Sequence, residues 1–175
     1  NFVMGCIQSG APVTIVRLTY RNGVATSRVL PKDDLLRLMR NPLLRSTGVL
    51  SGLFYDAVIV GEGDADRAFY QEINERLLRD RPEWGIPACL FINAQNKQTV
   101  PTIVRPLRDL GVPAAGIVDI DVLKDGGTEW GRHLQGACVP DLEHQSLGDL
   151  RSAIKAKLLE TGKDMTLDGG IDLLV

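Results

Sequence analysis

Four acidic side chains stand at the ends of two apolar stretches of this chain. Glu62 and Asp66 follow the apolar residues 57–60, and Asp119 and Asp121 come at the end of another apolar stretch. Two carboxylates about 4 Å apart repel each other by roughly 4 kcal/mol at an effective dielectric constant of about 20. A protein tolerates this repulsion when a cation lies between the groups or when one group is protonated. Because oxygen ligands select Mg²⁺ or Mn²⁺, the acids suggest a site for one or two such ions, as used in phosphoryl transfer.

The spacing of Asp119 and Asp121 predicts that both carboxylates point to one side, because residues two apart in a strand do so. Ligands of open α/β sheets bind beyond the carboxyl ends of the strands. The turn after a further apolar stretch adds polar residues at that edge: Asn93, Gln95, Asn96 and Lys97. Each residue also has a structural interpretation. Asp64 or Asp66 can cap the next helix, and a single lysine is usually a surface residue.

Three continuously apolar stretches are predicted to be strands buried in a parallel sheet: residues 57–60, 87–92 and 114–120. Helices are predicted between them, at 64–78 and 100–110, and Gly111 stands where a C-terminal cap belongs. The first helix is expected to pack through residues spaced by four: Ala65, Phe69, Ile73 and Leu77. Strands that alternate with helices indicate an open α/β sheet.

The segments on either side of this unit have a different pattern. Asn22-Gly23 between residues 13–20 and 24–30 predicts a β-hairpin, and Pro31 opens a helix. Residues 43–54 are a less regular helical stretch, residues 128–134 predict a short helix, and residues 147–159 predict an amphipathic helix. We place a boundary at residues 50–56, which separates an N-terminal extension (1–52) from a second domain (53–175). The apolar end at 173–175 leads us to expect a fragment of a longer protein.

Composition excludes several classes of protein. The 175 residues are 44% hydrophobic and carry a net charge of −2, so the chain is not disordered, and no apolar stretch is long enough to span a membrane. Three widely spaced cysteines fit neither a disulfide framework nor a zinc site, which favours the reducing cytoplasm. His133 and His144 are interpreted as surface residues, and Trp84 and Trp130 as packing residues.

The stretch Val60-Gly61-Glu62-Gly63-Asp64-Ala65-Asp66, followed by Phe69-Tyr70, resembles the first motif of the Toprim domain. Asp119-Ile120-Asp121 resembles its second motif. Residues 53–60 are similar to the same stretch of the OLD family (overcoming lysogenization defect) of ATP-dependent nucleases. The resemblance covers about residues 53–127 and implies a Toprim-like, Rossmann-like sheet flanked by helices.

The resemblance also implies a metal-dependent endonuclease that cleaves DNA in the cytoplasm and acts in phage defence. Glu62, Asp66, Asp119 and Asp121 match the acids that bind Mg²⁺ or Mn²⁺, two ions in all. Glu62 is alternatively the general base. Lys97, preceded by Asn96 where many Toprim sequences have glycine, would offset charge on the phosphate. A further lysine of OLD-type nucleases, nearer the C-terminus, is not located.

An OLD-type nuclease has an ABC-type ATPase domain before its Toprim domain. Residues 1–52 would then be the end of that domain or a linker, and ATP would bind only in the ATPase domain. The expected partner is DNA, with no membrane, and a homo-oligomer would form through the ATPase domain.

Three alternatives stay open at this stage. A haloacid-dehalogenase phosphatase also uses an Asp-x-Asp motif, but on its first strand and with a small or hydroxyl residue where this chain has Leu123. A receiver-like signalling domain clusters acids and a lysine around Mg²⁺ to accept phosphate. A Toprim fold that serves only DNA binding or assembly would have no need of all four acids.

Overall fold

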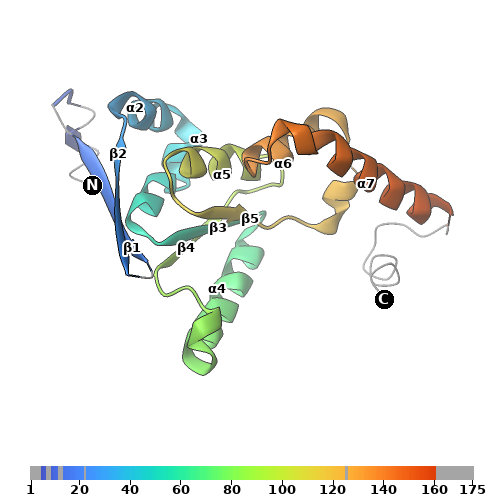
Figure 1. Ribbon diagram of the computed structural model, residues 1–175, viewed down its shortest axis with the longest axis horizontal. Coiled ribbons are helices and arrows are strands. Elements are labelled where there is room, and N and C mark those ends of the chain that lie inside the picture. Colours follow the sequence, from blue (N-terminus) through green and yellow to red (C-terminus); the bar gives the residue numbers. More distant parts are fainter. Residues whose placement is uncertain (1–4, 7–8, 12–13, 22, 125, 161–175) are drawn as a thin grey trace.

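A parallel sheet lies at the centre of the computed structural model. The structure describes residues 5–6, 9–11, 14–21, 23–124 and 126–160. Within this part of the chain, three strands pair in the order β4-β3-β5: β3 (Ala57–Gly61), β4 (Cys89–Asn93) and β5 (Ala114–Gly116). The helices α4 (Asp64–Asp80) and α5 (Val100–Asp109) lie on opposite sides of the sheet (Figure 1). The predicted open α/β fold is confirmed.

The central strand β3 is buried because its side chains are apolar on both faces. Val58 and Val60 are fully buried, whereas Ile59, on the opposite face, is half-buried. In the parallel register Val60 pairs with Ile92 of β4 and with Gly116 of β5. The carboxyl ends of all three strands therefore lie at one edge of the sheet. The third strand is shorter than the predicted 114–120, since regular pairing ends at Gly116.

Helix α5 covers the face of the sheet that carries Val58 and Val60. Its buried residues follow a helical period and include Ile103 and Leu107, both with no exposed surface. Pro101 lies in the first turn, where its missing amide has no helical partner to lose. Gly111 has a φ of 76°, as predicted for a residue that ends a helix in the left-handed region.

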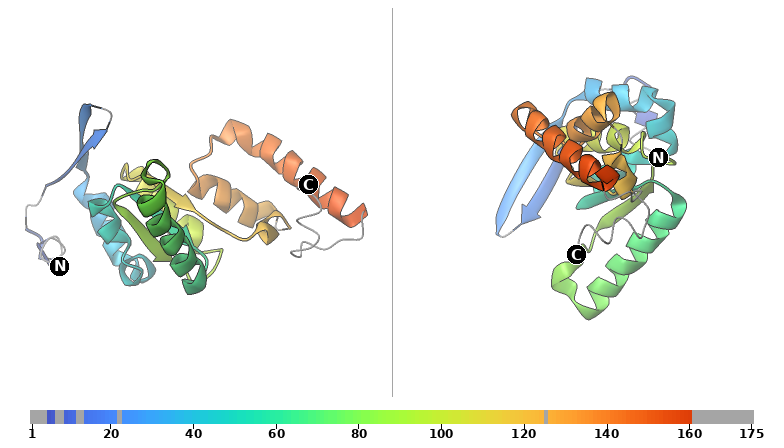
Figure 2. Two further views of the ribbon diagram at one scale, coloured as in Figure 1. Left: turned by 90° about the horizontal axis from the view of Figure 1, so that it is seen from below. Right: turned by 90° about the vertical axis from the view of Figure 1, so that its right-hand side faces the viewer.

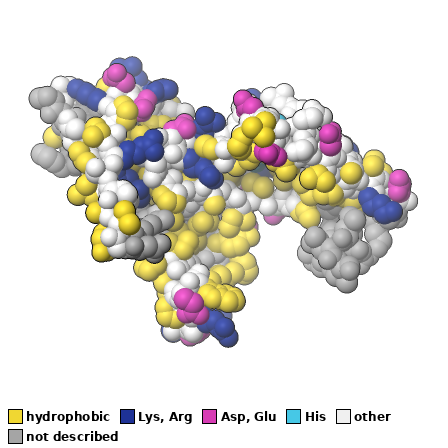
Figure 3. All heavy atoms as spheres, viewed as in Figure 1, with side chains coloured by type: hydrophobic (Ala, Val, Ile, Leu, Met, Phe, Trp, Pro, Cys, Tyr) yellow, Lys and Arg dark blue, Asp and Glu magenta, His cyan; other side chains and the backbone are white. Residues whose placement is uncertain are grey.

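Helix α4 differs from its prediction, because the face formed by Ala65, Phe69, Ile73 and Leu77 is not buried. Phe69 is 61% exposed, Ile73 is 37% exposed, and no residue of α4 is classed as buried. The helix is held instead through Asn74, whose side chain donates to the carbonyl of Ile86 and accepts from its amide. Figure 3 shows hydrophobic side chains at the surface around α4. The spacing of four identifies an apolar stripe, but Phe69 and Ile73 of that stripe stay exposed.

The N-terminal hairpin and the C-terminal helices lie at opposite ends of the molecule (Figure 2). The predicted hairpin is confirmed as β1 (Ile15–Arg21) and β2 (Val24–Leu30). The Arg17 side chain joins it to the rest of the protein by donating to the carbonyls of Gly111 and Tyr55, at 3.0 and 2.8 Å.

Three short helices follow the hairpin: α2 (Lys32–Arg40), α3 (Pro42–Ser46) and the 3₁₀ helix η1 (Val49–Phe54). They share a hydrophobic core with the sheet, since Leu35 and Val49 belong to the same buried cluster as Val58 and Ile103. Packing is thus continuous across residues 50–56. The division into an extension (1–52) and a second domain (53–175) stays a prediction.

The chain after β5 forms the 3₁₀ helix η3 (Ile120–Leu123) and the helices α6 (Gly127–Gly136) and α7 (Asp141–Glu160). Another short 3₁₀ helix, η2 (Pro82–Trp84), precedes β4. Helix α7 starts earlier than predicted and is not amphipathic in its packing, because Leu158 is its one buried residue while Leu142 and Leu150 are exposed. Thr161-Gly162, which the sequence pattern places directly after this helix, lie outside the described residues. Within the described part of the chain, no helix has both the length and the hydropathy needed to cross a membrane.

Two glycines of α6 have contrasting surroundings. A Cβ atom at Gly136 would lie 2.5 Å from Cβ and 2.7 Å from Cα of Pro101 in α5, whereas a Cβ atom at Gly131 would have no neighbour within 4 Å. Close packing of α6 on α5 therefore requires glycine at 136 but not at 131.

We expect Gly136→Ala to destabilise the protein by about 1–3 kcal/mol, because the added methyl group forces the two helices apart. Gly131→Ala in the same helix should stabilise it by about 0.5–1 kcal/mol, since alanine restricts the unfolded chain. Urea denaturation of both variants measures the difference. Similar free energies of unfolding for the two would contradict the packing described.

Candidate functional site

Glu62 connects the ends of two neighbouring strands. It follows β3 directly, and its Oε1 accepts a hydrogen bond of 2.7 Å from the backbone amide of Asp119, which comes shortly after β5. The preceding residue, Gly61, is buried, and a Cβ atom there would lie 3.1 Å from Cβ of Asp66. Glycine thus lets α4 begin close to the strand, and the first motif is held against the segment that carries the second.

The turn after β4 places a lysine opposite the second motif. Lys97 Nζ lies 2.9 Å from Oδ2 of Asp121 and donates a hydrogen bond to it. The polar residues predicted at this edge build the turn: Asn93 Oδ1 accepts from the Gln95 amide, and Asn96 Oδ1 accepts from the Thr99 amide. Side chains that bond their own backbone in this way stabilise turns, so these asparagines position Lys97.

Asp119 and Asp121 are not arranged as predicted, because neither lies in a strand. Asp119 has extended backbone (φ −63°, ψ 149°), and Asp121 belongs to the 3₁₀ helix η3. The amide of Val122 donates to the carbonyl of Asp119 at 3.1 Å, which turns the chain away from the sheet. The Asp119 residue is exposed and Asp121 is half-buried, so the two do not form a pair on one face of a strand.

Asp121 has one satisfied and one unsatisfied carboxylate oxygen. Oδ2 bonds to Lys97, whereas Oδ1 is buried and has no hydrogen-bond partner. A buried acceptor without a partner costs free energy, about 1–3 kcal/mol or more for a charged group. Such an atom is suited to bind a cation or a donor from a ligand.

Asp66 caps the helix that it belongs to. Its Oδ2 accepts a hydrogen bond of 2.9 Å from the amide of Gly63, the residue before α4. Asp64, the other predicted cap, is the first helical residue and pairs instead with Arg67 at 2.8 Å. The structure therefore gives Asp66 a structural contact, and its predicted part in metal binding is untested.

The pKa of Glu62 is raised above its usual range. Partial burial is the largest cause, and repulsion by Asp119 and Asp121 adds to it. The hydrogen bond from the Asp119 amide and the charge of Lys97 act in the opposite direction. Glu62, Asp119, Asp121 and Lys97 thus form one electrostatic group at the edge of the sheet, in which negative charge is in excess.

Two side chains of α7 that the sequence did not single out hold the end of η3. Arg151 Nη1 donates to the carbonyl of Leu123 at 3.1 Å, and Lys155 Nζ donates to the carbonyl of Lys124 at 3.2 Å. Helix α7 thereby fixes the segment that contains Asp121. No local pattern indicates this contact, because the bonded residues are 28 and 31 positions apart.

The possible metal ligands at this edge are carboxylate oxygens, which suit a hard divalent cation. One of them, Asp121 Oδ1, is buried without a hydrogen-bond partner. Over the described ranges, no three His, Cys, Asp or Glu side chains are grouped so that they could hold a metal ion as they stand. Mg²⁺ is commonly bound by one or two carboxylates together with water and substrate phosphates. Asp119, Asp121 and Glu62 supply carboxylates of this kind at one edge of the sheet.

A family model described as "Overcoming lysogenization defect protein-like, TOPRIM domain" matches residues 53–121. The match begins in η1, contains β3, β4 and β5, and ends at Asp121, so it includes Glu62 and Asp119. Residues 53–121 are therefore similar to an OLD-like TOPRIM domain. A TOPRIM domain is a metal-binding domain of the nuclease and primase type, which favours it over the phosphatase and receiver alternatives. No curated protein and no solved structure matched the chain.

The raised pKa of Glu62 predicts a pH-dependent effect of Glu62→Gln. A carboxylate with a raised pKa contributes stability below its unfolded-state pKa of about 4.3 and loses that contribution as the pH rises through its folded-state pKa. Glutamine can still accept from the Asp119 amide but has no charge. The variant should therefore be more stable than the parent at pH 7, by less than about 1 kcal/mol because solvent screens this carboxylate.

Urea denaturation at pH 7 and at pH 3.5 measures this effect, and the two proteins should not differ at the lower pH. Glu72→Gln is the matched control, because Arg76 lowers the pKa of Glu72 and the loss of that ion pair should not stabilise the protein. Equal stability of Glu62→Gln and the parent at pH 7 would contradict the described repulsion.

Proposed function

We propose that this TOPRIM domain is an endonuclease domain that hydrolyses phosphodiester bonds in DNA with Mg²⁺ or Mn²⁺. The observation that carries the proposal is the 2.7 Å contact between Glu62 and the Asp119 amide, which brings the two motifs to one edge of the sheet. The excess of negative charge there, with a buried unpartnered oxygen on Asp121, supports a divalent cation as the missing counter-charge.

The acids have separate roles in this proposal. Asp119 and Asp121 bind one ion, and Glu62 with Asp66 binds a second, or Glu62 acts as the general base. Cations held by these acids would supply a water of lowered pKa and would neutralise charge on the phosphate. Glu62 suits the role of a base because its raised pKa brings it nearer to neutral pH, where a base accepts a proton more readily.

Lys97 provides positive charge next to these acids. Its ammonium group contacts Asp121 and its side chain is largely buried, so its position is restrained. A restrained cation at this place orients Asp121 and attracts a phosphate oxygen of the substrate. Charge that develops on that phosphate would then be stabilised by a group that is already in position.

We also propose that this domain belongs to a larger protein. By analogy with OLD-type nucleases, residues 1–52 would join this domain to an ATPase domain, where ATP binds and through which a homo-oligomer forms. DNA is the proposed partner. These parts of the proposal depend on the family match at residues 53–121 and not on the geometry of the site.

Asp119→Asn and Asp121→Asn should each reduce metal-dependent nicking of supercoiled plasmid at least about 100-fold, because each removes a charged ligand from the site. Asp64→Asn is the matched control, since Asp64 lies close by in the sequence but pairs with Arg67 at the surface. Gel assays with Mg²⁺, Mn²⁺ and EDTA measure the activity. Normal nicking by both site variants would show that the acids are wrongly assigned.

Asp66 is tested by a pair of substitutions that separate its two roles. Asp66→Asn preserves an acceptor for the Gly63 amide but removes the charge, whereas Asp66→Ala removes both. If Asp66 binds metal, both variants lose nicking activity, and Asp66→Ala additionally loses about 1 kcal/mol of stability. Full activity of Asp66→Asn would leave Asp66 with the capping role alone.

A further inference from the structure

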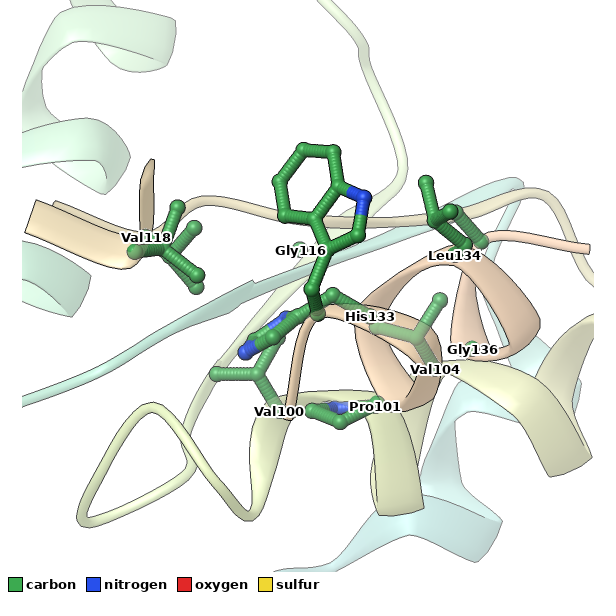
Figure 4. Close-up of a pocket in the computed structure, with 11 residues that line it drawn as sticks. Val100, Pro101, Val104, Gly116, Val118, His133, Leu134 and Gly136 are labelled. Atoms are coloured by element: carbon green, nitrogen blue, oxygen red, sulfur yellow. The ribbon is translucent and has the colours of Figure 1, made fainter. Parts of the chain in front are cut away.

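A cavity of about 230 Å³ lies between α5 and α6, next to the proposed site. Figure 4 shows side chains of both helices around it, and its walls are mainly apolar. The lining residues include Val118, Val122, Trp130, His133 and Ala137. A cavity of about 150 Å³ already holds a benzene ring, so this one has room for the ring system of one nucleobase.

The cavity adjoins the acids through the chain itself. Val118 and Val122 line it, and they flank Asp119 and Asp121 in the sequence. Neighbouring Cα atoms are about 3.8 Å apart, so the wall of the cavity begins one residue away from each aspartate. A nucleotide whose phosphate lies at the acids would therefore have its base within reach of the cavity.

The chemistry of the lining suits a flat ring with polar edges. Trp130 offers an aromatic face, and its Nε1 is buried without a hydrogen-bond partner. An indole N–H donates to a ring nitrogen or a carbonyl oxygen, and both occur on nucleobases. His133, predicted to be a surface residue, is half-buried in α6 and adds a second aromatic ring to the lining.

The backbone packs closely on two sides of the cavity. A Cβ atom at Gly116 would lie 2.4 Å from Cγ1 of Val100, and one at Gly136 would lie 2.5 Å from Cβ of Pro101. These glycines hold β5 and α6 against α5. The cavity is thus formed by the fold and does not depend on the position of a single side chain.

Positive charge lies near the aromatic wall. The guanidinium carbon of Arg151 is 6.0 Å from the centre of the Trp130 ring, and the same side chain donates to the Leu123 carbonyl. Lys155 approaches the neighbouring carbonyl of Lys124. An aromatic surface bordered by cationic groups is the arrangement that proteins use to stack bases of single-stranded DNA while attracting its phosphates.

We propose that this cavity binds one unstacked nucleobase, beside the phosphodiester bond that Glu62, Asp119 and Asp121 act on. The inference rests on the proposed function, because that function supplies DNA as the ligand. It adds that cleavage requires a base to leave the duplex stack, so single-stranded or distorted DNA is the preferred substrate.

The fluorescence of Trp130 tests this inference without any cleavage. The chain has two tryptophans, so Trp84→Phe leaves Trp130 as the one emitter. We expect thymidine monophosphate, deoxyadenosine monophosphate and a short single-stranded oligonucleotide to quench this emission in EDTA, with saturation. Deoxyribose 5-phosphate, which has no base, should not quench it.

A second variant fills the cavity without removing a contact. Ala137 lines the cavity at the end of α6 and is exposed, so Ala137→Leu in the Trp84→Phe background adds volume there. The dissociation constant of the oligonucleotide should rise about 5- to 100-fold, the effect of losing one stacked base. Gln135→Leu is the matched control, because Gln135 is exposed on the same helix and does not line this cavity.

The outcomes separate this inference from the proposed function. Plasmid nicking that depends on Asp119, without quenching by any nucleotide, would overturn the base-binding cavity and leave the nuclease intact. Quenching that Ala137→Leu weakens, in a protein that does not nick DNA, would support the cavity and contradict hydrolysis. Equal quenching by deoxyribose 5-phosphate, or equal affinity of the Ala137→Leu and Gln135→Leu variants, would also overturn the cavity.

Discussion

The hydrogen bond from the Asp119 amide to Glu62 is the interaction on which the site depends. It joins the residue after β3 to the segment after β5, and both strands end at the same edge because the sheet is parallel. The apolar core holds the strands in this arrangement, since Val58, Val60 and Ile103 are fully buried between the sheet and α5. The polar groups of the candidate site are thus positioned by apolar core residues that take no part in the proposed reaction.

The same edge illustrates how a fold tolerates like charges. Burial and two neighbouring aspartates disfavour the ionised form of Glu62, while Lys97 and a backbone amide favour it. The balance is incomplete, since Asp121 has a buried oxygen without a partner. Arg151 and Lys155 bond to backbone carbonyls at the end of η3, which restrains the segment against the repulsion. The excess of negative charge costs some stability, and it is the feature that suits this edge to the cation proposed above.

The sequence predicted those parts of the fold in which one local signal dominates. Asn22-Gly23 identified the hairpin, continuous apolar stretches identified β3 and β4, and Gly111 marked the end of α5. The topology also predicted that Glu62 and Lys97 lie at the same edge as the second motif, because strand ends of a parallel sheet converge, but it did not predict their individual contacts. The family match agrees with the resemblance at residues 53–121.

Other features depend on tertiary contacts that no local pattern contains. The stripe of Phe69 and Ile73 has helical spacing, but spacing does not show whether another element covers it. Asp119 and Asp121 do not continue the strand, because the chain turns into η3 at Ile120. The apolar stretch before them gave no sign of this turn. The cavity beside Trp130 requires α5 and α6 to meet at Pro101 and Gly136, which are 35 positions apart in the sequence (136 minus 101).

The attachment of the hairpin has a mechanical consequence. Arg17 bonds to the carbonyls of Tyr55 and Gly111, which lie two and three residues before the first residues of β3 and β5. The Arg17 side chain therefore bonds to the segments that precede β3 and β5. Glu62 and Asp119 follow the opposite ends of the same two strands. A displacement of the hairpin would therefore act on the segments before β3 and β5 at the same time, and not on one strand alone.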